Sequence, residues 1–263
     1  MEAPFIWQVA DSGYTLQQIK GSTWLMYDPE TNWTEYQPLQ KYTGLFRQFA
    51  ELNGQDELLR FANRYGLLGI PMDLRGIASV NAGRGTVVLR PELLADWNTK
   101  IIQLRAAVRL WDAIQRPDHG YLKQVINWKK NPKRVSYEDD HLLQTIRNTH
   151  TDGSQIKFGE LLWPAYYYIQ ERINDALKDS VAPRMLWHEN QLQLFHVPKS
   201  LLGAMWLQFA DAVTYELEFR ACAWCGKSFE VTLSTRSDRQ YCSNSCRVSA
   251  SRKRTSSAKR KQP

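Results

Sequence analysis

The sequence predicts a mostly α-helical body with a small β content, an α+β arrangement, followed by a compact C-terminal module built around cysteines. Three observations support this fold class. Apolar residues recur at three- and four-residue intervals along several long segments, which is the period of a helix with one buried face. Short β-like runs occur mainly near the N-terminus and near residues 185–197. The chain has 4 cysteines, and all of them lie between Cys222 and Cys246.

The first forty residues predict short strands and loops. The apolar runs Phe5–Val9 and Trp24–Tyr27 are separated by glycines and prolines, which is typical of strands joined by turns. The apolar period then becomes helical. It predicts one short helix over Leu45–Leu52 and a second over Leu58–Tyr65, which Gly66 ends.

A long helix is predicted to begin at Pro91 and to end near Gln115, after a strand at Thr86–Leu89. Its apolar positions alternate for almost three heptads: Leu94, Trp97, Ile101, Leu104, Val108 and Trp111. This stripe indicates a helix that faces the core. A dimerising coiled coil is the alternative, so a homodimer remains open.

Residues 117–160 are polar and mixed in charge. Within them the basic stretch Trp128–Arg134 predicts a solvated loop, because three acids, Glu138–Asp140, follow closely, and a phosphate contact is the alternative. A helix then follows over Phe158–Lys178. Two strand-like runs, Met185–Trp187 and Leu192–Val197, predict a hairpin that turns at Glu189-Asn190.

A last helix, capped by Ser200, is predicted to run almost directly into Cys222. The expected organisation is therefore a mostly helical domain over 1–218, a cysteine module over 219–250 and a basic tail over 251–263. The tail contains only Ser, Thr, Lys, Arg, Ala, Gln and Pro. Since such a composition buries little surface, it predicts disorder.

The charge of the chain is concentrated at its C-terminal end. The formal net charge is +7. Residues 247–263 contribute seven cations and no acid, which leaves 27 basic and 27 acidic residues before them. A localised positive field attracts polyanions, and nucleic acid is the main candidate.

The composition argues against several other classes of protein. The N-terminus lacks the pattern of a secretory signal, and the longest nearly unbroken apolar stretch, Leu161–Ile169, is too short to span a bilayer. We therefore expect a cytoplasmic protein without a membrane partner. The 5 histidines are scattered, and no hydrolase, metalloprotease or dinucleotide motif is present. A catalytic role is not expected; a nuclease is the remaining enzymatic alternative.

The four cysteines have the spacing of a metal site. Cys222 and Cys225 are separated by two residues and Cys242 and Cys246 by three, with sixteen residues between the pairs. The second spacing places two sulfurs on one face of a helical turn. Four thiolates form a closed structural Zn²⁺ site, so we expect one zinc ion per chain. A mononuclear iron site and disulfides are the alternatives.

The segment Cys222–Arg247 resembles treble-clef zinc fingers whose second half reads Tyr-Cys-Ser-x-x-Cys-Arg. A helical N-terminal region with one such finger at the C-terminus resembles the bacterial CGNR-type zinc-finger proteins. That resemblance implies a DNA-binding transcriptional regulator in which the finger contacts the DNA. The Gly-Asn pair of that family is absent here, because Cys246 is followed by Arg247-Val248-Ser249.

The module and tail carry the candidate nucleic-acid contacts. Residues 219–263 hold eleven cations and two acids, and four thiolates with Zn²⁺ add about −2. Such a field attracts phosphates, with DNA favoured over RNA. A protein-interaction finger and a purely structural zinc cap are the alternatives. The predicted contacts are Arg236, Arg239, Arg247, Arg252, Lys253 and Arg254, with Trp224 either stacked on a base or packed on the last body helix.

Overall fold

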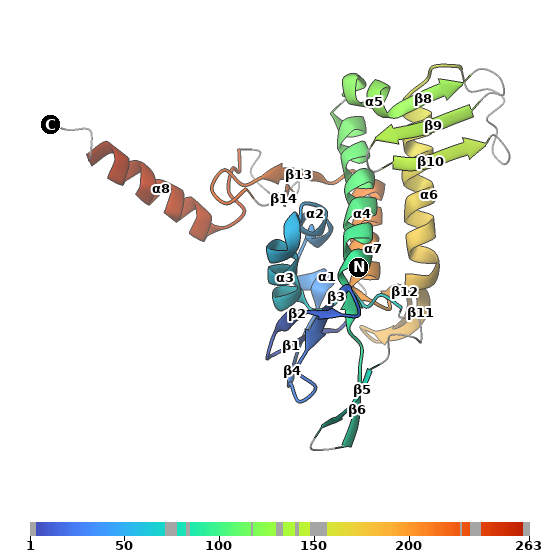
Figure 1. Cartoon of the computed structure of the whole chain (residues 1–263). Coiled ribbons are helices and arrows are strands. Elements are labelled where there is room, and N and C mark those ends of the chain that lie inside the picture. Colours follow the sequence, from blue (N-terminus) through green and yellow to red (C-terminus); the bar gives the residue numbers. More distant parts are fainter. Residues whose placement is uncertain are drawn as a thin grey trace.

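The computed structural model describes residues 4–71, 78–82, 85–116, 118–129, 134–139, 142–147, 157–226, 228–231 and 238–259. Long helices α4, α6 and α7 form the centre of the body, with small sheets at both ends (Figure 1). A module that starts at strand β13 extends to one side and ends in helix α8, which projects away from the body (Figure 1). The fold is thus a mixture of helices and several small sheets, with more β-structure than the sequence predicted.

The N-terminal region contains the predicted strands and two further ones. Strands β1 (Trp7–Ala10) and β4 (Trp33–Tyr36) pair antiparallel, as do β2 (Tyr14–Ile19) and β3 (Ser22–Tyr27). Three helices follow. Helices α2 (Leu45–Ala50) and α3 (Gly54–Tyr65) correspond to the two that were predicted, whereas α1 (Pro38–Lys41), which precedes them, was not predicted.

The longest helix begins three residues later than predicted. Glu92–Leu93 forms strand β7, which pairs with β3, and α4 runs from Leu94 to Gln115. The Glu92 carboxylate is buried and accepts hydrogen bonds from the Leu68 and Ile70 amides and from Trp97 Nε1. Burial raises the pKa of Glu92, against the opposing effect of these donors. Glu92 therefore joins a loop to the sheet and does not open the helix.

The polar region 117–160 contains regular structure, and both described ends of the predicted loop Trp128–Arg134 lie in strands. This region forms α5 (His119–Val125) and an antiparallel sheet of β8 (Ile126–Lys129), β9 (Arg134–Asp139) and β10 (Leu142–Arg147). The reason is tertiary packing: Val125, Val135 and Tyr137 are buried in the main core, and the Tyr137 hydroxyl donates to the Pro164 carbonyl. Burial of these few side chains determined the structure of the segment, although most of its residues are polar. The stretch 130–133 lies outside the described residues.

The second half of the body matches its prediction more closely. Helix α6 (Leu162–Ser180) leads into a hairpin of β11 (Val181–His188) and β12 (Gln191–Pro198), and α7 (Leu201–Thr214) follows. The hairpin turn is made by Glu189 and Asn190, both with positive φ. Ser200 caps α7 as expected, since its side chain accepts from the Gly203 amide.

Two further pairs of strands complete the described elements. Strands β5 (Ala78–Ala82) and β6 (Gly85–Leu89) form an antiparallel pair before β7. Strands β13 (Glu218–Ala221) and β14 (Ser228–Val231) form a hairpin that precedes α8 (Asn244–Lys259). Helix α8 extends into the segment 251–263 that its composition predicted to be disordered; Arg, Lys and Ala are favourable helix formers. No helix among the described residues has the length and apolar character needed to cross a membrane.

Candidate metal centre

The candidate metal centre is built from two local structures that each supply two cysteines. Cys222 and Cys225 lie in the turn between β13 and β14, which is closed by a hydrogen bond of 2.9 Å from the Gly226 amide to the Cys222 carbonyl. Gly226 has φ 72°, a conformation that glycine adopts without steric cost. Cys242 lies just before α8, and Cys246 lies in its first turn.

The four sulfur atoms all lie within 4.8 Å of one another. The Cys225 and Cys242 sulfurs are 3.6 Å apart, and the Cys242 and Cys246 sulfurs are 3.5 Å apart. Zinc–thiolate bonds of about 2.3 Å in a tetrahedron place the sulfurs about 3.8 Å from one another. The described geometry therefore fits one metal ion bound by four thiolates, as the cysteine spacing predicted.

The protonation of the thiols also suits a cation. Burial acts to raise the pKa of the Cys222 thiol, but hydrogen bonds from the Cys225, Cys242 and Trp224 amides lower it to about 6. Burial raises the pKa of the Cys242 thiol to about 12, and the neighbouring sulfurs add to this effect. Neighbouring thiolates repel one another in the absence of a cation, and a bound dication removes this penalty.

Arg239 supports the metal site from the side. Its Nε donates to the Tyr241 carbonyl at 2.9 Å, and its Nη2 donates to the Cys242 carbonyl at 2.6 Å. The same guanidinium lies 5.0 Å from the centre of the Phe229 ring. Arg239 was predicted to contact nucleic acid, and the structure gives it a positioning role for Cys242. The sequence alone did not indicate these carbonyl contacts.

The start of α8 is fixed by Ser243. The Ser243 side chain accepts a hydrogen bond of 3.2 Å from the Cys246 amide. Such a side-chain cap satisfies an otherwise unpaired amide in the first helical turn. Ser243 and Arg239 therefore hold the two ends of the loop that carries Cys242.

The β13–β14 hairpin has two faces with different partners. Phe219 and Glu230 are cross-strand partners on one face, and Arg220 and Phe229 are partners on the other. Phe219 packs in the main core of the body, whereas the Phe229 ring contacts Arg239 of the module. Both rings are only 6% exposed. The hairpin thus lies between the body and the metal centre.

Phe219 attaches the module firmly to helix α2. Its ring meets Phe46 edge-on at 5.4 Å, and the Arg47 guanidinium lies 4.6 Å from its centre. Arg47 is held in place by a two-pronged ion pair with Asp112 of α4. A residue just beyond the predicted boundary at 218 is therefore part of the body core.

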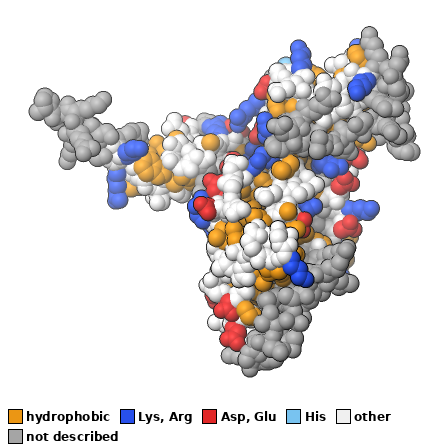
Figure 2. All heavy atoms as spheres, viewed as in Figure 1, with side chains coloured by type: hydrophobic (Ala, Val, Ile, Leu, Met, Phe, Trp, Pro, Cys, Tyr) orange, Lys and Arg blue, Asp and Glu red, His pale blue; other side chains and the backbone are white. Residues whose placement is uncertain are grey.

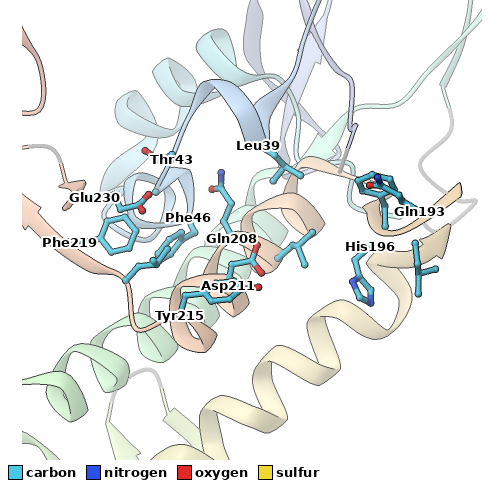
Figure 3. A pocket seen from close by; sticks show the side chains of 15 residues that line it. Leu39, Thr43, Phe46, Gln193, His196, Gln208, Asp211, Tyr215, Phe219 and Glu230 are labelled. Atoms are coloured by element: carbon cyan, nitrogen blue, oxygen red, sulfur yellow. The ribbon is translucent and has the colours of Figure 1, made fainter. Parts of the chain in front are cut away.

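A cavity of about 470 Å³ lies where the body meets this hairpin. Figure 3 shows Glu230 and Phe219 at one end, Asp211 and Gln208 of α7 in the middle, and His196 toward β12. No Lys or Arg is among its described lining residues. The cavity separates the module from the β11–β12 hairpin.

The remaining predicted cations lie on or near α8. Arg247, Arg252 and Lys253 are exposed residues of this helix. Arg254 is also in α8, and Arg236 lies outside the described residues. The Lys253 ammonium lies 5.7 Å from the centre of the Trp224 ring, so this ring contacts α8. Figure 2 shows Lys and Arg side chains along the arm that the module and α8 form.

A hollow is present on the surface at the start of α8. Its lining combines cations, amides and hydroxyls with one acid: Asp238, Arg239, Gln240, Tyr241, Ser243, Asn244 and Arg247. Groups of these kinds donate hydrogen bonds to phosphate oxygens in protein–DNA interfaces. No family model, curated protein or solved structure matches this chain.

Proposed function

We propose that this protein binds nucleic acid, DNA in preference to RNA, as a regulator of transcription of the kind that the CGNR resemblance implies. In this proposal the cysteine module is a treble-clef finger with one structural zinc ion, and α8 is its contacting helix. The proposed role is binding and not catalysis, because four thiolates leave no open position for a reacting water.

Zinc is the metal that the ligand set favours. Thiolate ligands in a tetrahedral arrangement suit zinc or iron–sulfur chemistry, and zinc is the usual occupant of a closed four-cysteine structural site. A cysteine turn, a hairpin and a helix that donates the last ligand together resemble the treble-clef arrangement. The described order of β13, the Cys222–Gly226 turn, β14 and α8 is compatible with it.

The observation that carries the proposal is the position of the basic residues relative to the metal centre. Arg247 follows the ligand Cys246 directly and also lines the hollow at the start of α8. A helix N-terminus favours anions because its first amides are unpaired and its dipole is positive there. The folded cysteine site would hold this surface rigid against a phosphate backbone.

Helix α8 extends the same surface away from the body (Figure 1). Residues 247 and 254 share one face of the helix, since seven residues are close to two turns. Cys246, Ala250 and Lys253 occupy another face, on which Ala250 is buried and Lys253 meets Trp224. One face therefore attaches the helix to the module, and a second carries Arg247, which is exposed.

The binding of labelled duplex DNA, single-stranded DNA and RNA, measured by fluorescence anisotropy from 50 to 300 mM salt, tests the proposal. If about four to six phosphates are neutralised, the slope of log K against log salt is about −4 to −5 on duplex DNA. Changing Arg252, Lys253 and Arg254 together to Ala should flatten this slope by about 2 to 3 units.

The matched control removes three exposed cations from the body instead: Lys20, Arg60 and Lys178, all changed to Ala. It lowers the net charge equally but should leave the slope unchanged. Arg247→Ala tests base reading, and a loss that differs by about 1–3 kcal/mol between a preferred site and random DNA identifies a base contact. Absence of binding at 50 mM salt contradicts the proposal and favours a protein-interaction finger.

A further inference from the structure

The β11–β12 hairpin carries a block of exposed apolar side chains on its outer face. Met185 is opposite Leu194, and Trp187 is opposite Leu192. Residues two apart on a strand point to the same side, so these four side chains share one face. Their exposed fractions are 58% for Met185, 61% for Leu194, 70% for Trp187 and 64% for Leu192. On the other face, Phe195 and Leu186 pack toward the body.

This block is about as large as the largest apolar patch of a typical soluble monomer. If each fully exposed large side chain presents about 150–250 Å², the four together expose roughly 500 Å² of mostly apolar surface. The largest apolar patches of soluble monomers span about 300–600 Å² and are often functional. Single exposed apolar residues need no explanation, but four in paired positions form a continuous surface.

The hairpin also carries few of the charged residues that protect exposed sheets from association. Strand β12 contains no Lys, Arg, Asp or Glu over its eight residues, and β11 contains only Arg184. Among the described residues, each of these strands pairs only with the other. Natural sheets protect such surfaces with charged residues, and a bare apolar sheet is a site of association.

We propose that this outer face is the interface of a symmetric homodimer, in which two hairpins pack face to face about a two-fold axis. A two-fold interface must be self-complementary, and an uncharged apolar block meets this condition when it packs on its own copy. Two copies together bury about 1,000 Å², the lower limit for a specific interface. Sheets that pack face to face do so with nearly aligned strands.

The polar residues around the block agree with an antiparallel arrangement of the two hairpins, because a carboxylate can accept a hydrogen bond from an imidazole N–H. The centre of the block lies at Leu186 and its cross-strand partner Gln193. Glu189 lies three residues beyond Leu186, toward the tip of the hairpin. His196 lies three residues beyond Gln193, toward the base of the hairpin. A two-fold axis through the centre therefore brings Glu189 of each copy next to His196 of the other, and both residues are exposed in the single chain.

Sedimentation equilibrium of the full-length, metal-loaded chain from 1 to 100 µM tests this proposal. We expect a dimer with twice the 30.6 kDa mass of the chain. The double variant Trp187→Ser, Leu192→Ser should dissociate into monomers, with a dimer dissociation constant at least ten-fold higher. The control Tyr166→Ser removes another exposed apolar side chain, 47% exposed near the opposite end of α6, and should leave the dimer intact.

A second variant keeps the test decisive if the double variant folds poorly. Glu189→Lys changes one exposed turn residue and should weaken the dimer several-fold, because an ammonium cannot accept the hydrogen bond that the carboxylate accepts from His196 of the other copy. A wild-type chain that remains monomeric at 100 µM overturns the proposal, even if the same surface captures a different protein. A dimer that tolerates both variants also overturns it, because the interface then lies elsewhere.

Discussion

Replacing Phe219 with alanine separates the stability of the body from that of the metal centre. Phe219 is 6% exposed and packs in the body core against Phe46 and Arg47. Removal of a buried phenyl ring costs about 3–5 kcal/mol, which includes the loss of its aromatic and cation–π contacts. Because a domain of this kind is stable by about 5–15 kcal/mol, a loss of this size is easily measured.

The matched variant is Phe229→Ala, which removes an equally buried ring from the opposite face of the same hairpin. Phe229 contacts Arg239, which in turn holds the carbonyls of Tyr241 and Cys242. We therefore expect Phe229→Ala to leave unfolding of the body almost unchanged and to accelerate metal loss. Phe219→Ala should lower the free energy of unfolding of the body and change metal release much less.

Two measurements on each variant provide the comparison. Urea denaturation followed by tryptophan fluorescence reports the body, and transfer of the metal to a chromogenic chelator reports the centre. Equal effects of the two variants in both measurements would refute the assignment of one hairpin face to the body and the other to the module. Faster metal release from Phe219→Ala than from Phe229→Ala would refute it as well.

Three further predictions concern single residues. Elemental analysis of the wild-type chain should give close to one zinc equivalent. Cys242→Ser should remove this metal and unfold the module, because a core this small does not fold without its ion. Retention of the metal by the variant would contradict this prediction. Arg239→Ala should speed metal release, because Arg239 holds the Cys242 carbonyl. Unchanged metal release would contradict this, and weaker binding of nucleic acid would show that Arg239 also makes its predicted nucleic-acid contact. Glu92→Gln should reduce the pH dependence of urea denaturation. The pKa of Glu92 is raised by burial, so the folded protein binds the Glu92 proton more tightly than the unfolded chain does. In the wild type, the contribution of Glu92 to stability therefore falls as the pH rises through the ordinary carboxyl range and above it. Identical pH profiles for the wild type and the variant would contradict the raised pKa of Glu92.

The cysteine site could be predicted from the sequence because its geometry is mostly local. A two-residue gap with a following glycine folds back on itself, and a spacing of four places two sulfurs on one side of a helical turn. The structure then brings the sulfurs of both pairs within 4.8 Å. The helices α4, α6 and α7 could be predicted for a similar reason, since the period of their apolar residues is a property of each segment alone.

The sheet of β8, β9 and β10 could not be predicted from its own residues. Its segment is polar on average, and only packing of Val135 and Tyr137 into the main core decides its conformation. Strand β7 is a similar case, because pairing with β3 delays the start of α4 to Leu94. Such contacts join residues far apart in the chain, and no local pattern specifies them.

The sequence by itself determined the cysteines of the candidate metal site, the long helices of the body and the concentration of positive charge at the C-terminal end. Only the tertiary structure decided how these parts are used. It assigned Arg239 to the support of Cys242, gave the β13–β14 hairpin one face for the body and one for the module, and left Trp187 and its three neighbours on a bare outer face. The physical reason is that residue type and spacing fix local geometry, whereas the partner of a side chain depends on which distant segments fold against it.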